Sequence, residues 1–237
     1  MIMIKRLFKD GIVSGNQLKM IALLSMTLDH VGFYIFPHIT WLRIAGRLAF
    51  PVFAYMIAEG CKFTSDRKKY LLKLAVFAFA CQVAAFIGSG SLYQCIFVTF
   101  SMSVAVVYSI DYAVCKRSYK AYTVMFCTLA AVYFLTVILP DILYMTNYKV
   151  DYGFFGVMLP VAVYFSKGKL YKLLSAAVVL ILISLGAWWV QWYSLISLIL
   201  LSIYNGKRGK VNMKNLFYIY YPLHLSIIYF ISIIKRT

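Results

Sequence analysis

The sequence predicts an all-α integral membrane protein, a polytopic bundle of about nine (eight to ten) transmembrane helices with a cytoplasmic N-terminus. Of the 237 residues, 63% are hydrophobic and only 13% are charged, whereas about 25% of the residues in soluble domains are charged. Apolar runs of about 20 residues, the length of one span, fill the chain almost completely. We therefore expect a single transmembrane domain over residues 18–237, preceded by a short basic cytoplasmic segment over residues 1–17.

Windows of about 19 residues that are apolar enough to cross a bilayer recur along the chain. Only Gly186 and the stretch WWVQWY divide the seventh window from the eighth, because residues 173–204 carry no charge. An eight-span or re-entrant arrangement therefore stays open beside the nine-span one. We expect the helices at residues 18–36, 44–60, 70–87, 92–114, 121–139, 152–166, 171–187, 189–204 and 215–234.

The net charge of +17, from 24 basic and 7 acidic residues, indicates topology. Nineteen of the basic residues fall in the N-terminal segment and in every second loop, a pattern that assigns these segments to the cytoplasm. No nucleic-acid partner is needed to explain the charge. Lys235 and Arg236 would lie outside in a nine-span arrangement, which favours the eight-span alternative. The basic segments are residues 5–19, 62–73, 116–120, 167–172 and 207–214.

The sequence predicts neither a metal site nor a cleaved leader. Its five cysteines are scattered and form no Cys-x-x-Cys pair, so a disulfide framework is not expected either. Basic residues followed by an apolar run begin the chain as in a signal peptide. That run contains Asp29 and His30 and lacks a small-residue cleavage site, which predicts an uncleaved first helix.

Ionisable side chains inside predicted spans mark candidate functional sites, because a charge in a bilayer is costly. His30 lies about 9 Å below the outer end of the first helix, and Arg47 is expected at a similar depth in the second. Arg43 precedes Arg47 by four residues and shares its helix face. Pro51, one turn deeper, is expected to kink that helix. These residues predict a polar pocket in the outer half of the membrane.

Three further ionisable residues extend this set. Neighbouring side chains on a helix point about 100° apart, so Asp29 is expected to pair with Arg47 rather than to orient His30. Glu59 lies about 18 Å along the helix axis from Arg47, at the cytoplasmic end. His224 is expected near the midplane. Structural roles stay open: Arg43 could snorkel to the headgroups, and both histidines could be plain interhelical hydrogen-bonding residues.

A histidine beside an arginine suits acyl transfer. A neutral imidazole can act as general base on an amine or hydroxyl, and a guanidinium can bind an anion or stabilise an oxyanion. The turn YNGKRGK, residues 204–210, combines two glycines with three basic side chains and suits the phosphates of a donor. A transporter of a small organic anion would use the same residues.

Five stretches of the sequence resemble the TraX family, named for the protein that N-acetylates the F-type pilin. They are LKMIALLSMTLDHVGFYIFP, WLRIAGRLAFPVFAYMIAEG, DYGFFGVMLP, YNGKRGK and FYIYYPLHLSIIY, in this order between Leu18 and Tyr229. The resemblance implies a multi-pass protein of the bacterial inner membrane that transfers acetyl from cytoplasmic acetyl-CoA to an acceptor at or across the membrane. It carries over the motif residues Asp29, His30, Arg43, Gly46, Arg47, Pro51, Glu59, Gly60, Asp151, Gly153, Asn205, Lys207, Arg208, Pro222 and His224.

The resulting hypothesis is a membrane acyltransferase. Its catalytic candidates are His30, Asp29 and Arg47. The donor, acetyl-CoA or another acyl-CoA, is expected to bind at Lys207, Arg208, Asn205 and His224, with residues 67–69 as a further candidate. The substrate-binding candidates are Arg43, Asp151, Tyr152 and Glu59. The expected partners are membrane lipids, acyl-CoA and an acceptor that is a pilin-like protein amine, a glycan or a lipid. Besides the transporter, an acyltransferase or flippase for lipid headgroups and a purely structural membrane partner are the alternatives.

Overall fold

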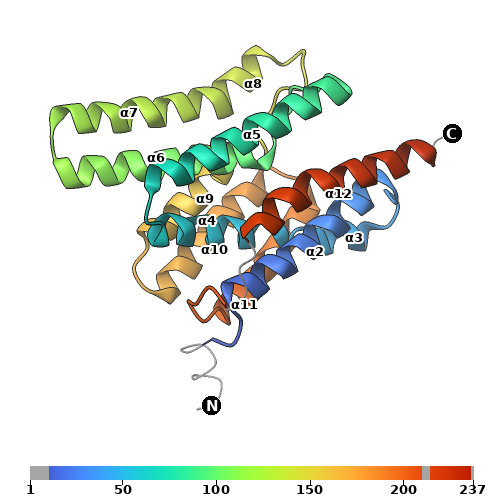
Figure 1. The fold of residues 1–237 in the computed structure, drawn as a ribbon, viewed down its shortest axis with the longest axis horizontal. Helices are drawn as coiled ribbons and strands as arrows, with labels where there is room; N and C mark the ends of the chain where they lie inside the picture. The colour runs from blue at the N-terminus through green and yellow to red at the C-terminus, as the bar shows by residue number, and fades with distance from the viewer. Residues whose placement is uncertain (1–10, 210–213, 236–237) are drawn as a thin grey trace. The chain divides into compact units, whose positions relative to one another are not determined.

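The computed structural model describes residues 11–209 and 214–235, and these residues are almost wholly helical (Figure 1). Helices account for 79% of the structure, and the described residues form no β-strand. The all-α prediction is therefore confirmed.

Each predicted apolar window coincides with a helical segment of the structure. The second, fifth and eighth windows are each divided between consecutive short helices. In chain order the segments are α2 (Gly15–Tyr34), α3 (Thr40–Gly46), α4 (Ala49–Phe63), α5 (Arg67–Ser89), α6 (Ile96–Lys116), α7 (Tyr119–Tyr133), the π-helical η1 (Phe134–Ile138), α8 (Leu139–Ile142), α9 (Gly153–Phe165), α10 (Lys169–Leu185), the 3-10 helix η2 (Trp189–Ile196), α11 (Ser197–Ser202) and α12 (Lys214–Ile234).

The helices have the apolar character of a membrane protein. Four segments are both long and apolar enough to cross a bilayer, namely Thr40–Phe63, Arg67–Ser89, Ile96–Lys116 and Tyr119–Ile142. Shorter apolar helices occupy Gly153–Phe165, Trp189–Ser202 and Ile219–Ile234. The nine-span count and the cytoplasmic N-terminus stay predictions.

The chain forms two compact units, and each is described by itself. Unit 1 comprises residues 1–56 and 168–237, and unit 2 comprises residues 57–167. Helix α4 crosses from the first unit into the second after Met56. The single transmembrane domain stays a prediction.

In unit 1, a capping box starts α2. The Ser14 side chain accepts a hydrogen bond from the backbone of Gln17, and the Gln17 side chain accepts one from the backbone of Ser14. Helix α3 then packs closely against α2, because small residues line the contact: the Ser25 hydroxyl donates to the Ala45 carbonyl, and a Cβ on Gly46 would overlap Asp29. This close approach brings the motif residues of both helices together.

The second predicted window differs from the structure in two respects. It begins at Thr40 rather than at residue 44, and it is broken between α3 and α4, at Arg47 and Leu48. The cause is Pro51, which has no N–H to donate to the carbonyl four residues earlier, that of Arg47. Pro51 therefore divides the predicted span into two helices, whereas the sequence predicted one helix with a kink.

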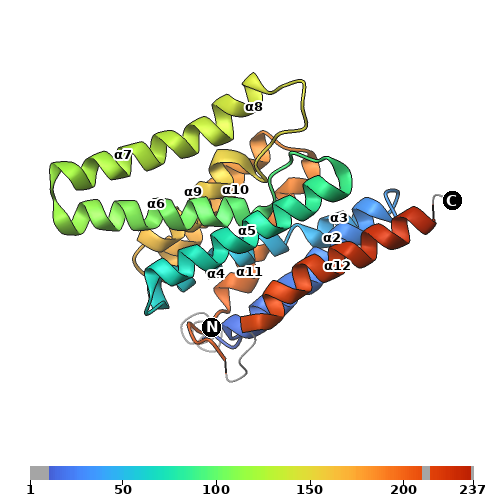
Figure 2. The same ribbon diagram turned by 45° about the horizontal axis from the view of Figure 1, so that its top comes forward.

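Helix α12 lies alongside α2, although the two come from opposite ends of the chain (Figures 1 and 2). The hydroxyl groups of Thr27 on α2 and Tyr220 on α12 are hydrogen-bonded at 2.7 Å. This pairing brings His224 to the helix that carries His30.

In unit 2, α6 is the central helix and packs against α5, α7 and α9. Buried valines fill the contacts, among them Val104 and Val107 on α6 and Val157 on α9. The Ser103 hydroxyl donates to the Val157 carbonyl at 2.8 Å, which satisfies a buried polar group between two apolar helices. Helix α5 begins with Asp66 capping the Lys69 amide.

Candidate functional site

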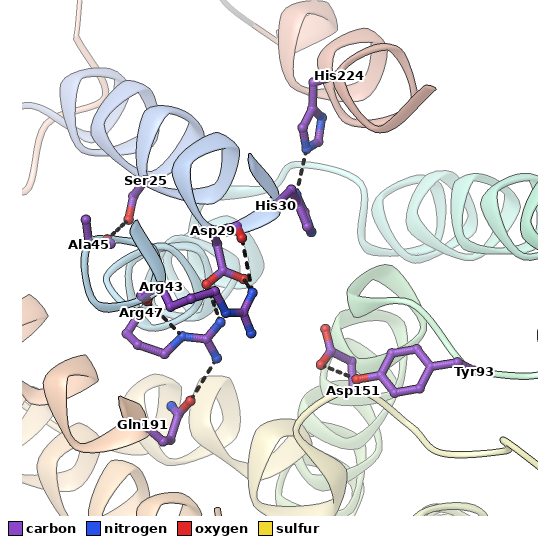
Figure 3. A network of polar contacts seen from close by, with 10 residues as sticks. All are labelled: Ser25, Asp29, His30, Arg43, Ala45, Arg47, Tyr93, Asp151, Gln191 and His224. Atoms are coloured by element: carbon purple, nitrogen blue, oxygen red, sulfur yellow. Dashed lines mark hydrogen bonds and ion pairs between the residues drawn. The ribbon is translucent and has the colours of Figure 1, made fainter. Parts of the chain in front are cut away.

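The first polar cluster of unit 1 is one aspartate shared by two arginines (Figure 3). Arg43 Nη1 lies 2.7 Å from Asp29 Oδ2, and Arg47 Nη2 is paired with Asp29 Oδ1. The side chains of Arg43, Arg47 and Asp29 are only 20%, 14% and 15% exposed. Two guanidinium groups and one carboxylate leave this buried cluster with a formal charge of +1.

Arg47 has further hydrogen-bond partners, which hold its guanidinium in place. Its Nε donates to the Arg43 carbonyl at 3.4 Å, and its Nη1 donates to Gln191 Oε1 at 3.2 Å. Gln191 is buried and belongs to η2, a helix that the sequence analysis did not connect with the site. In the sequence, Gln191 is the lone amide of WWVQWY, the stretch that divides two predicted spans.

The second polar cluster is a pair of histidines between α2 and α12 (Figure 3). His30 Nδ1 lies 2.9 Å from His224 Nε2, and His224 Nδ1 lies 2.8 Å from the carbonyl oxygen of Tyr220. The Tyr220 ring is stacked on the His224 imidazole at 5.1 Å. These contacts fix the position of both rings.

The tautomers of the two rings follow from these contacts when both are neutral. A carbonyl only accepts, so His224 carries its proton on Nδ1 and presents the lone pair of Nε2. His30 must then donate through Nδ1, and its own Nε2 keeps a lone pair. Within residues 11–209 and 214–235, no hydrogen bond reaches this Nε2 of His30. An imidazole in this state can accept a proton from a nucleophile.

Asp29 and His30 thus face different partners, as their spacing on the helix predicts. Asp29 points to α3, and His30 points to α12. The expectation of a single pocket in which Arg47 adjoins His30 is replaced by two adjacent clusters on one helix. His224, expected near the midplane, lies within hydrogen-bond distance of His30.

The turn proposed for the donor lies against the N-terminus of α2. The carbonyl oxygens of Lys207 and Arg208 accept from the amides of Gly15 and Asn16 at 2.8 and 2.9 Å. These first amides of α2 are therefore occupied by the chain itself. The side chains of Lys207 and Arg208 are exposed, and Asn205 Oδ1 accepts from the Lys207 amide at 2.9 Å. The turn is thus held rigidly with its basic side chains outward.

The remaining substrate candidates belong to unit 2. Asp151 accepts a hydrogen bond from the Tyr93 hydroxyl at 2.8 Å (Figure 3), and its carbonyl accepts from Thr99 at 2.7 Å. Tyr152 has a left-handed backbone (φ 58°) at the start of α9. Glu59 is buried on α4. In the loop before Asp151, burial raises the pKa of Tyr148.

A second ion pair in unit 2 joins α5 to α6. Arg67 Nη2 lies 2.9 Å from Asp111 Oδ2, and the Tyr164 hydroxyl donates to the same oxygen at 2.6 Å. Asp111 lies near the end of α6, and its partners come from α5 and α9. Among the described residues, no three His, Cys, Asp or Glu side chains are grouped as metal ligands would be.

The family follows from a comparison of the whole chain. The sequence model described as "TraX protein" matches residues 14–232, nearly the full length. This chain belongs to the TraX family. The match covers both clusters of unit 1, the YNGKRGK turn and all of unit 2, so the TraX assignment includes every candidate residue described above.

Curated relatives are similar over short stretches. The chain is 50% identical over 38 residues to an uncharacterised protein of Rickettsia prowazekii (strain Madrid E), which is 16% of this chain and 15% of that protein. It is 34% identical over 73 residues to the probable fimbrial assembly protein FimC, serogroup H1, of Dichelobacter nodosus, which is 29% of this chain and 30% of that protein. The aligned part is thus less than a third of either relative. No solved structure matches the chain.

Proposed function

We propose that this TraX-family protein is a membrane-embedded acyltransferase. It transfers an acetyl or other acyl group from cytoplasmic acyl-CoA to an amine or hydroxyl acceptor at or beyond the outer half of the bacterial inner membrane. The observation that carries the proposal is the hydrogen-bonded pair of His30 and His224, in which Nε2 of His30 keeps its lone pair. Family membership supports the reaction class, because the family is named for a pilin-acetylating protein.

In the proposed reaction His30 acts as the general base. Its Nε2 removes the proton of the acceptor amine or hydroxyl while that atom forms a bond to the thioester carbonyl carbon. The tetrahedral intermediate then collapses, the carbon–sulfur bond breaks, and the thiolate leaves as CoA. The proton held by His30 passes to that sulfur, so the base is regenerated. His224 positions His30 through the 2.9 Å hydrogen bond and stabilises the imidazolium form, since its Nε2 accepts from His30 Nδ1.

The arginine cluster supplies positive charge beside this base. Its formal +1 charge, held by Asp29 and Gln191, favours the negative oxygen of the intermediate or an anionic group on the acceptor. Because Asp29, Gln191 and the Arg43 carbonyl engage Arg47, we assign Arg47 mainly an electrostatic role. Asp29 is the residue that holds both guanidinium groups.

The donor phosphates are proposed to bind the exposed side chains of Lys207 and Arg208. The contacts of the turn with Gly15 and Asn16 support this assignment, because a rigid turn loses little entropy on binding. The acceptor class rests on similarity alone. A pilin-like amine is favoured by the family name and by the relative described as a probable fimbrial assembly protein.

The test is a thiol-release assay on the detergent-purified protein with acetyl-CoA and a panel of amines and hydroxyl acceptors. We expect CoA release that depends on the acceptor. Replacing His30 with Ala is expected to lower the rate by about 10²- to 10⁴-fold, the usual contribution of a general base, while acetyl-CoA binding is retained. His38→Ala is the matched control, because His38 is exposed in a loop and is expected to leave the rate unchanged.

The donor end is tested separately. The double replacement Lys207→Ala and Arg208→Ala is expected to raise the KM for acetyl-CoA with little change in kcat. The reverse pattern, in which the His30 variant loses acetyl-CoA binding and the loop variant loses catalytic rate, would show that the catalytic and donor-binding assignments are exchanged. Uptake of an organic anion into proteoliposomes without CoA release would favour the transporter instead, which the buried +1 cluster also suits.

A further inference from the structure

Unit 2 contains a cavity at the basic ends of α5 and α6. Its volume is about 340 Å³, and its walls come from the first residues of α5 and the last turns of α6. Arg67 and Lys68 contribute from α5, and Tyr108, Tyr112 and Lys116 contribute from α6. Nothing in the acyl-transfer reaction proposed above uses this cavity.

The charge of the cavity wall is positive and largely uncompensated. Asp111 is the acidic residue of the lining, and it is already bonded to Arg67 and Tyr164. Neither Lys68 nor Lys116 has a carboxylate partner among the residues that the structure describes. Two lysines of the lining thus carry a positive charge that no described carboxylate pairs with, so the wall of the cavity suits an anion.

Two contacts fix the position of Arg67 at the cavity wall. The Arg67 guanidinium is bonded to Asp111 at 2.9 Å and lies 5.2 Å above the Tyr108 ring. The Arg67 side chain is nevertheless 50% exposed, so donors remain accessible to a ligand. A planar guanidinium fixed in this way matches the oxygens of a phosphate group.

The surface beside the cavity is apolar. On α5, Leu72, Val76 and Phe79 are exposed and recur every three to four residues, so they form one stripe along the helix. Lys68 lies one turn before Leu72 and begins this stripe. Because α5 is long and apolar enough to cross a bilayer, we expect its stripe in the region of the acyl chains and the cavity at the level of the headgroups.

We propose that this cavity binds the phosphate of an anionic membrane phospholipid. The phosphodiester contacts Lys68, Lys116 and the exposed edge of Arg67, and an acyl chain lies along the stripe of Leu72, Val76 and Phe79. The ligand chemistry is a phosphate ester attached to an apolar chain. The nucleotide end of CoA also carries phosphates, but it has no long apolar chain to occupy the stripe. The lipid is therefore the occupant that fits both features.

The experiment is a lipid titration of the full-length protein in non-ionic detergent, with bound lipid counted by native mass spectrometry. The probes are phosphatidylglycerol and, as zwitterionic reference, phosphatidylcholine. We expect preferential binding of one phosphatidylglycerol to the wild-type protein. The double variant Lys68→Gln and Lys116→Gln is expected to weaken that binding roughly 30-fold, because each basic side chain near a lipid headgroup contributes.

The matched control is the double variant Lys69→Gln and Lys120→Gln, which removes the same charge from exposed positions in the first turns of α5 and α7, outside the cavity lining. It is expected to change binding less than about threefold. Equal weakening in both double variants, or no preference for phosphatidylglycerol, would overturn the proposal. Competitive displacement of the lipid by CoA would assign the cavity to the donor instead. Because the readout is lipid binding, its result is independent of whether the protein transfers acyl groups.

Discussion

Each unit contains an aspartate that is ion-paired with arginine. The two clusters differ in how deeply their arginine side chains are buried and in their net charge. In unit 1, Asp29 serves both Arg43 and Arg47, and all three side chains are at most 20% exposed. In unit 2, Asp111 is paired with one arginine, Arg67, whose side chain is 50% exposed, while that of Asp111 is 17% exposed. A buried cation that loses its counter-ion stays uncompensated, whereas an exposed one is solvated by water.

The difference separates an ion pair with a half-exposed arginine from a buried cluster whose net charge is costly in apolar surroundings. A single ion pair at a helix end contributes little and can be replaced. Two arginines on one carboxylate inside apolar helices leave a net positive charge where charge is expensive. A role of this charge in binding a substrate, as in the proposed function, would account for its energetic cost.

The sharpest test of this comparison is to neutralise each aspartate without changing its size. Asp29→Asn removes the carboxylate that two buried guanidinium groups share, and we expect a loss of about 3–5 kcal/mol in the free energy of unfolding. Asp111→Asn is expected to cost less than about 1 kcal/mol, because Arg67 is half exposed. Heating the purified proteins and following the folded fraction by size-exclusion chromatography compares them. Equal losses would remove the distinction between the two clusters.

A smaller effect is expected from the packing that builds the unit 1 cluster. A methyl group on Gly46 would overlap the Asp29 side chain, so Gly46→Ala is expected to cost about 1–3 kcal/mol through overpacking. Gly88 on α5 provides the control, since a Cβ there meets nothing within 4 Å. Gly88→Ala is expected to be neutral or to stabilise by up to about 1 kcal/mol. The same thermal measurement applies, and a neutral Gly46→Ala would show that α2 and α3 can separate at no cost.

Much of the helical arrangement is predictable from the sequence, because each apolar run of about 20 residues favours one helix regardless of its neighbours. The shared face of Arg43 and Arg47 is predictable for a similar local reason, the four-residue spacing. Pro51 marks the break, but only the structure shows that it divides the helix at Arg47 and Leu48. Local sequence patterns thus predict which segments are helical better than they predict where each helix ends.

Pairings between distant elements are not predictable in this way. His30 and His224 are 194 positions apart, and nothing in either segment specifies that α2 lies beside α12. Gln191 reaches Arg47 across 144 positions from a 3-10 helix that reads as a plain polar-aromatic stretch. Such contacts depend on how helices pack, and a single sequence contains no measure of that packing. The candidate residues could therefore be proposed from the sequence, whereas their contact partners came from the structure.

A small effect is also expected from the hydrogen bond that accompanies the ion pair of unit 2. Tyr164→Phe removes the hydroxyl that donates to Asp111 at 2.6 Å, and we expect a loss of about 0.5–1.5 kcal/mol, because Arg67 still engages the same carboxylate. Combining it with Asp111→Asn completes a double-mutant cycle. Side chains in direct contact are expected to show a coupling energy of at least about 0.5 kcal/mol. A strictly additive double variant would mean that Tyr164 stabilises unit 2 through its ring alone. The unit 2 cluster would then be a bare surface ion pair, which would widen its contrast with the shared carboxylate of Asp29.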